Sequence, residues 1–149
     1  MRIQLLNFLR SHQVVTVAVA EPDGTAHAAA LFYAVDDELN LYVLTESASR
    51  HGRAMARTGY VAGTIQRDKQ KWQQIQGAQF HGRCRRLKGP ARERGWNIFS
   101  ARFPFVRNAG MTLTEALGKT ALWRIEPAWI RLIDNRRGFG HKEEWTRET

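Results

Sequence analysis

The chain has 149 residues, a length that fits one domain able to bury a core without disulfides or a structural metal. Its 23 Lys and Arg residues against 14 Asp and Glu residues give a net charge of +9, which points to phosphorylated ligands or polyanions as partners. The sequence contains no apolar run of the roughly 18 residues that a membrane helix needs, so a membrane protein is not expected.

The N-terminal third of the sequence predicts a helix followed by an antiparallel meander. Leu5, Leu6 and Leu9 place one apolar stripe on a helix over residues 2–11. Segments rich in apolar and β-branched residues follow with short connections, and they predict strands over 14–20, 26–35 and 41–45. The first connection, 21–24, contains the proline and glycine that favour a tight turn.

The remainder of the chain predicts further strands separated by helices. Strands are expected over 60–65, 74–87, 121–125 and 129–133, and helices over 47–57, 91–102 and, as a short piece, 111–118. Glu126-Pro127 is expected to separate the last two strands, and the tail from Asn135 is polar apart from Phe139 and Trp145. Many short strands with few helices predict a barrel or sandwich, and closure into a barrel would remove exposed edges.

The segment from Thr45 to His51 lies where a strand ends and a helix begins. Such a junction presents free backbone N–H groups and the positive end of the helix dipole. Hydroxyls at Thr45, Ser47 and Ser49 add donors, and Arg50 supplies a planar cation suited to bidentate phosphate binding. The residue types therefore suggest a phosphate site, with an ordinary helix N-cap followed by exposed side chains as the alternative.

Self-contained catalytic signatures are absent from the sequence. It has no Gly-x-Ser-x-Gly elbow and no Gly-x-x-x-x-Gly-Lys phosphate loop, and its five histidines form no His-x-x-x-His pair, so a zinc site is not expected. The basic stretch from Arg83 to Arg94 lacks the paired aromatics of an RNA-recognition sheet. We expect that stretch to be a surface feature and nucleic-acid binding to be weak and indifferent to sequence.

The first residues and the cysteine count favour a cytoplasmic protein. Asn7 and Arg10 interrupt the first apolar stretch, which argues against a secretory signal. The single cysteine, Cys84, excludes an internal disulfide and a cysteine-rich metal site. Cys84 is expected to be a small strand residue rather than a reactive thiol.

A set of short segments spread over residues 12–145 carries a family likeness in its order and spacing. The segments are Val14-Val15-Thr16, Leu31-Phe32-Tyr33, Leu41-Tyr42-Val43-Leu44-Thr45 with Ser49-Arg50-His51, Val61-Ala62-Gly63-Thr64-Ile65, Ile75 to Gly82 with Arg85-Arg86-Leu87, Arg102-Phe103-Pro104, and Asp134-Asn135 with Gly138-Phe139-Gly140. Together they resemble the FMN-binding split barrels related to pyridoxamine 5′-phosphate oxidase, and more narrowly a group of small bacterial proteins in that superfamily.

The resemblance implies one antiparallel split β-barrel domain over residues 1–149, with a few short flanking helices, that forms a homodimer and holds FMN between its subunits. By the resemblance, the phosphate lies at Thr45, Ser49, Arg50 and His51. The isoalloxazine runs along backbone groups near Leu31, Phe32, Tyr33 and Leu44, and polar side chains of Gln76 and Gln79 reach its edge. Trp123 approaches the flavin from the partner chain or, alternatively, packs in the core.

One departure from the family pattern limits what the resemblance implies about activity. Pyridoxamine phosphate oxidases carry an Arg-x-His signature near the C-terminus, whereas this chain reads Trp129-Ile130-Arg131-Leu132-Ile133 there. Vitamin B6 oxidation is therefore not expected, and deazaflavin or haem is an alternative cofactor. The leading hypothesis is a flavin-dependent oxidoreductase that acts on a small-molecule substrate of unknown identity. The alternatives are a flavin-storing protein without turnover and a basic nucleic-acid-binding barrel.

Overall fold

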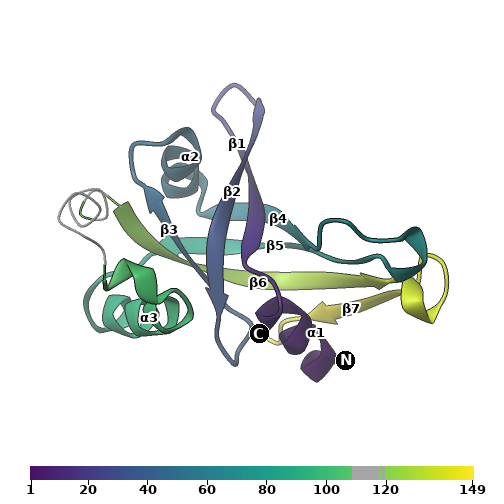
Figure 1. Cartoon of the computed structure of the whole chain (residues 1–149). Coiled ribbons are helices and arrows are strands. Elements are labelled where there is room, and N and C mark those ends of the chain that lie inside the picture. Colours follow the sequence, from purple (N-terminus) through teal and green to yellow (C-terminus); the bar gives the residue numbers. More distant parts are fainter. Residues whose placement is uncertain (109–117, 119) are drawn as a thin grey trace.

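The computed structural model describes residues 1–108, 118 and 120–149, and these form seven strands and three α-helices (Figure 1). The strands are β1 (Val14–Ala20), β2 (Ala26–Val35), β3 (Leu41–Glu46), β4 (Tyr60–Gln66), β5 (Gln76–Arg86), β6 (Thr120–Asp134) and β7 (Lys142–Thr146). The helices are α1 (Arg2–Arg10), α2 (Arg50–Thr58) and α3 (Gly89–Arg102). Short 3₁₀ turns are η1 (Trp72–Gln74), η2 (Pro104–Val106) and η3 (Asn135–Arg137).

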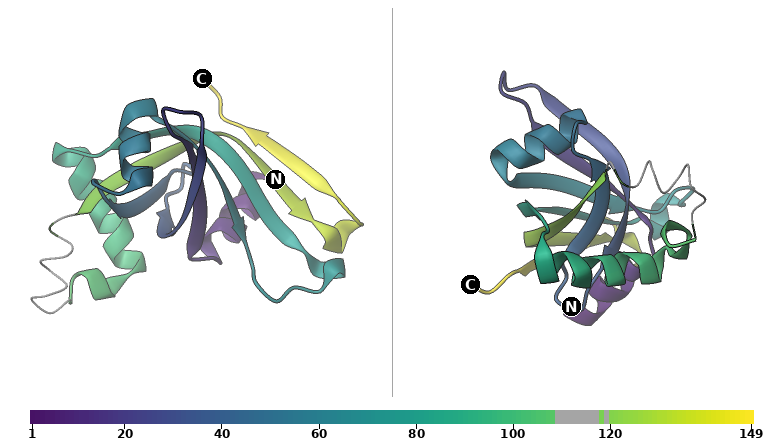
Figure 2. Two further views of the ribbon diagram at one scale, coloured as in Figure 1. Left: turned by 90° about the horizontal axis from the view of Figure 1, so that it is seen from above. Right: turned by 90° about the vertical axis from the view of Figure 1, so that its left-hand side faces the viewer.

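The strands pair in the order β3-β2-β1-β4-β5-β6-β7, and every pairing is antiparallel. Because β3 also pairs with the first part of β6, strands β1 to β6 close into a barrel, which protects their edges. Figure 2 shows the far ends of β5 and β6 running out past the barrel together with β7. The expected mainly β split barrel and its opening meander are therefore confirmed.

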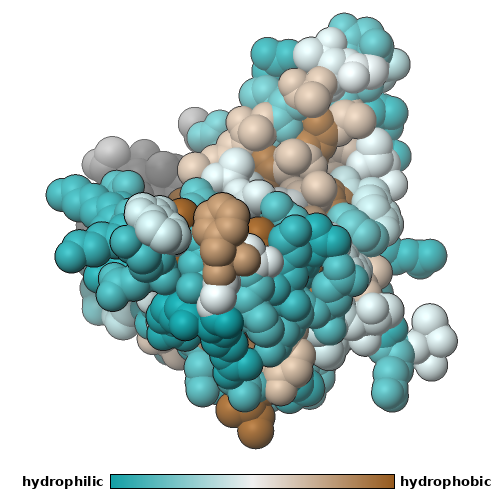
Figure 3. Space-filling model, turned by 90° about the vertical axis from the view of Figure 1, so that its right-hand side faces the viewer, coloured by the Kyte–Doolittle hydropathy of each residue, from teal (hydrophilic) through white to brown (hydrophobic). Residues whose placement is uncertain are grey.

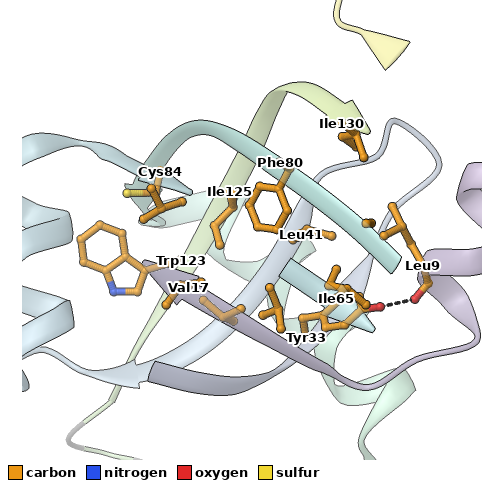
Figure 4. Packing of buried hydrophobic residues seen from close by; sticks show 14 of the residues in the cluster. Leu9, Val17, Tyr33, Leu41, Ile65, Phe80, Cys84, Trp123, Ile125 and Ile130 are labelled. Carbon is orange, nitrogen blue, oxygen red and sulfur yellow. Dashed lines mark hydrogen bonds between the residues drawn. The ribbon is translucent and has the colours of Figure 1, made fainter. Parts of the chain in front are cut away.

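The interior of the barrel is filled by every second side chain of its strands. Val15 and Val17 of β1 point inward and are fully buried. Tyr33 of β2 is also buried, and its hydroxyl donates to the Leu9 carbonyl, which ties α1 to the barrel (Figure 4). Cys84 lies in the same core, and burial raises the pKa of its thiol to about 11. Cys84 is thus a buried strand residue, as expected.

A second, smaller apolar cluster joins α3 to the outside of the barrel. Phe99 and Phe103 are buried there against Tyr42 of β3 and Leu122 of β6, and Trp96 packs at the edge of the cluster. The aromatic stripe expected on this helix therefore has a packing role.

The predicted break at Glu126-Pro127 is wrong, because β6 is one strand of 15 residues. Opposite β5, Gly82 pairs with Pro127 and His81 pairs with Trp129, so Ala128 is the extra residue of a β-bulge. A proline lacks the N–H of a regular ladder position, and the bulge absorbs that loss. A Cβ at Gly82 would lie 2.1 Å from the Glu126 carbonyl oxygen, so this crossing also needs glycine.

Two further expectations differ from the structure or fall outside it. The polar tail forms η3 and β7, which pairs with the second part of β6, although no strand was expected there. The alternating pattern of β7 is weak because only one of its two less exposed positions, Trp145, is apolar, whereas the other is Glu143. The helix expected over 111–118 lies outside the described residues apart from position 118. None of the described helices has the length and apolar character of a membrane span.

Candidate phosphate site at the β3–α2 junction

The chain turns sharply between the end of β3 and the start of α2. Ser49 is the N-cap of α2: its Oγ accepts a hydrogen bond from the Gly52 amide at 3.1 Å and donates to the Glu46 carbonyl at 2.7 Å. A Cβ at Gly52 would lie 2.5 Å from the Glu46 carbonyl oxygen, so only glycine fits this close approach. The turn thus presents the first amides of α2, including those of Arg50 and His51, which precede the intrahelical hydrogen bonds.

A hydroxyl–imidazole cluster lies beside these amides. Thr45 is buried at the end of β3, and its Oγ1 contacts His51 Nε2, which also lies 3.3 Å from Ser49 Oγ. The His51 ring stacks on His27 of β2, with centroids 6.2 Å apart. Burial, and then the charge of His27, lower the pKa of His51, which favours its neutral imidazole.

Arg50 lies next to this cluster and is already paired. Its Nε and an Nη donate to the two carboxylate oxygens of Glu21, each at 2.7 Å, and this bond lowers the pKa of Glu21. Arg53, one turn further along α2, is exposed and forms no ion pair with any described residue. Two arginines therefore lie near the start of α2, of which one is bound to a carboxylate and one is not.

The residues predicted to follow the isoalloxazine lie on both sides of the barrel wall. Leu31 and Tyr33 point into the barrel, whereas Phe32 points outward, is half exposed and contacts the Phe103 ring at 5.2 Å. Leu44 is partly buried against the α3 cluster. The predicted contacts with the isoalloxazine are made by backbone groups, and the side-chain directions do not test them. The contacts therefore stay a prediction.

The structure does not bring Gln76 and Gln79 together. They lie on opposite faces of β5: Gln76 Nε2 donates to Asp134 Oδ2 at 3.4 Å, whereas Gln79 is exposed on the outer face. Trp123 is buried in the barrel core (Figure 4), which matches the packing alternative. Its indole N–H has no hydrogen-bond partner among the described residues. Of the two glutamines predicted to reach the flavin, only Gln79 therefore faces outward from the barrel.

Gln79 belongs to an outer sheet face built mainly from small residues. The strand register aligns Ala28, Ala18 and Ala62 side by side across β2, β1 and β4, and His81 and Trp129 continue this row. Ala30, Thr16 and Thr64 form a neighbouring row that ends at Gln79 and Arg131. Figure 3 shows a continuous pale to brown surface in its upper half, where the β1–β2 hairpin projects (Figure 1), besides smaller apolar spots at its centre and lower edge.

Sequence reasoning missed two residues of the junction, Glu21 and His27. Both lie on the β1–β2 hairpin, more than 20 positions before α2, and only the folded barrel places them beside Arg50 and His51. No local pattern marks them, because a turn carboxylate and an isolated strand histidine are common surface features. Among the residues that the structure describes, no three His, Cys, Asp or Glu side chains form a metal-binding group.

Comparisons with known proteins agree with this geometry at the level of the family. The family model described as pyridoxamine 5′-phosphate oxidase matches residues 1–134. A UPF0306 protein from Klebsiella pneumoniae is 32% identical over 141 residues, which cover 95% of this chain and 90% of that protein.

Solved structures share the fold at lower identity. A conserved hypothetical protein from Mycobacterium tuberculosis has a TM-score of 0.76 at 23% identity, covering 92% of this chain and 86% of its own. A haem-binding protein from Mycobacterium smegmatis has a TM-score of 0.78 at 13% identity, covering 98% of this chain and 58% of its own.

Proposed function

We propose that this chain, which belongs to the pyridoxamine 5′-phosphate oxidase family and to the UPF0306 proteins within it, is a single flavin-binding domain that holds FMN at the β3–α2 junction. The observation that carries the proposal is the set of donors gathered there. The first-turn amides of α2, the hydroxyls of Thr45 and Ser49, and the guanidinium of Arg50 all lie at one turn. This donor chemistry fits a phosphate dianion.

Arg50 is the principal phosphate anchor in this proposal, and Glu21 has two effects on it. The carboxylate holds the guanidinium in one position beside α2. It also competes with the phosphate, because it occupies the Nε edge of the guanidinium and places a negative charge beside the other N–H groups of Arg50. Arg53, which forms no ion pair with any described residue, is the second cation at the same helix end.

The flavin supplies the redox chemistry, since in flavoproteins hydride and electron transfer belong to the cofactor. The chain need only bind and orient it: backbone groups of β2 and β3 near Leu31 to Tyr33 and Leu44 would follow the ring. We infer an oxidoreductase role on a small molecule. Oxidation of NADH or NADPH by the FMN-loaded protein, followed by electron transfer to an acceptor, tests that role, and its failure with FMN still bound would favour a storage protein.

The anchor is tested by titrating FMN and riboflavin into the wild type and Arg50→Ala. Loss of a bidentate, charge-assisted contact should weaken FMN binding by roughly ten- to a thousandfold. Riboflavin has no phosphate and should bind both proteins alike. Arg85→Ala is the matched control, because Arg85 is equally exposed and also pairs with a glutamate, Glu126. Unchanged FMN affinity in Arg50→Ala would reject the anchor.

The spectrum of the protein after reconstitution separates the possible cofactors. FMN, a deazaflavin and haem have distinct absorption bands, so parallel titrations with each identify the preferred one. Haem binding in preference to FMN would reject the flavin proposal, and the Arg50→Ala series would then have no phosphate to report on.

A second copy of the chain is the partner that we propose for the alanine rows. Three alanines aligned across adjacent strands make a flat apolar surface, and a symmetric copy can cover it without large side chains interlocking. The same face carries Gln79, so the partner would bring a polar side chain to the flavin edge.

Ala18→Arg tests this interface, because position 18 is central in the row Ala28, Ala18 and Ala62. Light scattering of the wild type should give twice the 17.1 kDa chain mass, and the variant should fall towards the single-chain mass. Ala56→Arg, at an exposed position on α2, is the control. A wild type that is monomeric at micromolar concentration would reject the interface.

A further inference from the structure

A second charged site lies at the opposite end of the barrel from α2. The β4–β5 connection, residues 67–75, lies beside η3, and two hydrogen bonds join them: the Asn135 amide donates to the Ile75 carbonyl at 2.8 Å, and Asn135 Nδ2 donates to the Trp72 carbonyl at 2.7 Å. Figure 1 shows these two segments together at the right-hand end of the molecule, and Figure 3 faces that end, whose surface there is largely hydrophilic. We call the hollow between them the basic cup.

The basic cup is a cavity of about 350 Å³ whose lining is cationic and amide-bearing. Its lining residues are Arg67, Lys69, Gln70, Lys71, Gln74, Gln76 and Arg136. Arg67, Lys69 and Lys71 form no ion pair with any described residue, whereas Arg136 is held by Asp134 at 2.9 Å. Three unpaired cations in one hollow create a strong positive potential that an anion would relieve.

The backbone of the connection is ordered without help from those cations. The side chain of Gln70 donates to the carbonyls of Arg67, at 2.8 Å, and Gln76, at 3.2 Å, and accepts from the Gln76 amide at 2.8 Å. Lys69 has a φ of 55°, a left-handed conformation that is unusual for lysine. The loop thus fixes the start of each cationic side chain and leaves the charged ends free.

An exposed aromatic pair comes from the same part of the chain, one ring next in sequence to Lys71 of the cup and the other just after η3. Trp72 of the connection is 60% exposed and Phe139, just after η3, is 86% exposed. Their ring centroids lie 6.1 Å apart at an interplanar angle of 74°. Large exposed rings beside cations are the combination that proteins use to stack a base and hold its phosphates.

We propose that the basic cup is a nucleotide site, with the phosphates among Arg67, Lys69, Lys71 and Arg136 and the base against Trp72 and Phe139. The cations converge on one hollow instead of following a groove along the surface, which favours a free nucleotide with two or more phosphates over a nucleic-acid strand. The cup is separate from the β3–α2 junction, so a nucleotide and FMN bind together. Gln76, which the family likeness assigns to the flavin edge, also lines the cup.

Calorimetric titration of the FMN-loaded protein with ADP, pyrophosphate and adenosine tests the site. ADP should bind most tightly, pyrophosphate more weakly and adenosine most weakly, and the ADP affinity should fall as salt rises. Lys69→Glu and Lys71→Glu should each weaken ADP binding by at least about tenfold. Lys88→Glu, a charge reversal at an exposed lysine next to α3, should leave it unchanged.

Trp72→Ala separates the two parts of the site. It should weaken ADP but leave pyrophosphate binding as in the wild type, because only the base contacts the ring, and Trp72→Phe should restore ADP. Circular dichroism checks that each variant is folded. Three results would overturn the proposal: no ADP binding by the wild type, competition between ADP and FMN, or binding of oligonucleotides alone. The flavin proposal survives the first and third results, because its readout is FMN affinity in the Arg50 series.

Discussion

The two positively charged regions of the barrel manage their charge in opposite ways. At the β3–α2 junction, Arg50 is held by Glu21. The Thr45 hydroxyl bonds His51, and the Ser49 hydroxyl bonds the Glu46 carbonyl and lies beside His51. In the basic cup, Arg67 and Lys71 have no carboxylate partner among the described residues. The carboxylate holds the paired cation in place but competes with an incoming anion, whereas an unpaired cation has no such competitor and is held only through its backbone.

The two regions also differ in how closely their backbones are packed: the junction is crowded and the cup is not. The junction depends on a close approach at Gly52, where no side-chain atom fits. The connection that forms the cup is ordered by one glutamine side chain, Gln70, and has room around Gly77 at its base, where an added Cβ would find its nearest neighbour 3.6 Å away. The junction should therefore tolerate less change than the cup, and substitutions can test this difference.

The largest effect is expected for Gly52→Ala. The new Cβ would meet the Glu46 carbonyl oxygen at 2.5 Å and Ser49 Oγ at 2.9 Å, so the turn must open. We expect a loss of about 1–3 kcal/mol in the free energy of unfolding, which is the usual cost of overpacking. FMN binding should fall as well, because the N-cap and the first-turn amides move together. Urea unfolding and FMN titration measure the two effects.

Gly77→Ala is the matched substitution at the base of the cup. Its Cβ finds only ordinary contacts, so the free energy of unfolding should change by less than about 0.5 kcal/mol. Equal losses in the two variants would show that the junction is no more tightly built than the cup, and the comparison would fail.

Local sequence patterns were enough to predict most of the strands and helices. Runs of apolar residues with short turns between them were enough to place β1, β2 and β3, because each of these strands satisfies its pattern within a few residues. The break predicted at Pro127 failed for a non-local reason: the bulge opposite Gly82 accommodates the proline, and only the partner strand shows it. The strand β7 was missed because its one large apolar residue, Trp145, gives too little alternation.

The candidate site was predictable only in part for the same reason. Hydroxyls and a cation around a helix start form a local pattern, so Thr45, Ser49 and Arg50 could be proposed from the sequence. The residues that set their behaviour, Glu21 and His27, come from another hairpin. The basic cup also escaped notice, because η3 joins the β4–β5 connection only through the long pairing of β5 with β6.

A smaller effect is expected when the junction loses its internal carboxylate. Glu21→Gln keeps a hydrogen-bonding side chain but removes the charge that competes with phosphate for Arg50. FMN should then bind more tightly, by at most about fivefold, because exposed ion pairs are weak. In Arg50→Ala the same substitution should have no effect, and this double-mutant cycle measures the coupling. Weaker FMN binding in Glu21→Gln alone would mean that Glu21 positions the arginine more than it competes.

The smallest effect is a pH dependence that belongs to the junction and has no counterpart in the cup, which lacks a histidine. Burial and the charge of His27 lower the pKa of His51 in the folded chain. The unfolded chain therefore takes up this proton at a higher pH than the folded chain does. The contribution to stability is complete above the ordinary histidine pKa and is lost as the pH falls below it.

The free energy of unfolding should accordingly decrease between about pH 7 and pH 5.5, and His51→Gln should make this decrease shallower. Gln retains a group that can bond Thr45 and Ser49, so the turn should persist in the variant. An NMR titration of the His51 ring measures the same quantity without unfolding, and His27→Gln should raise the midpoint by removing a neighbouring positive charge. A His51 midpoint above the ordinary histidine value would reverse the sign and indicate a carboxylate or an anion beside the imidazole.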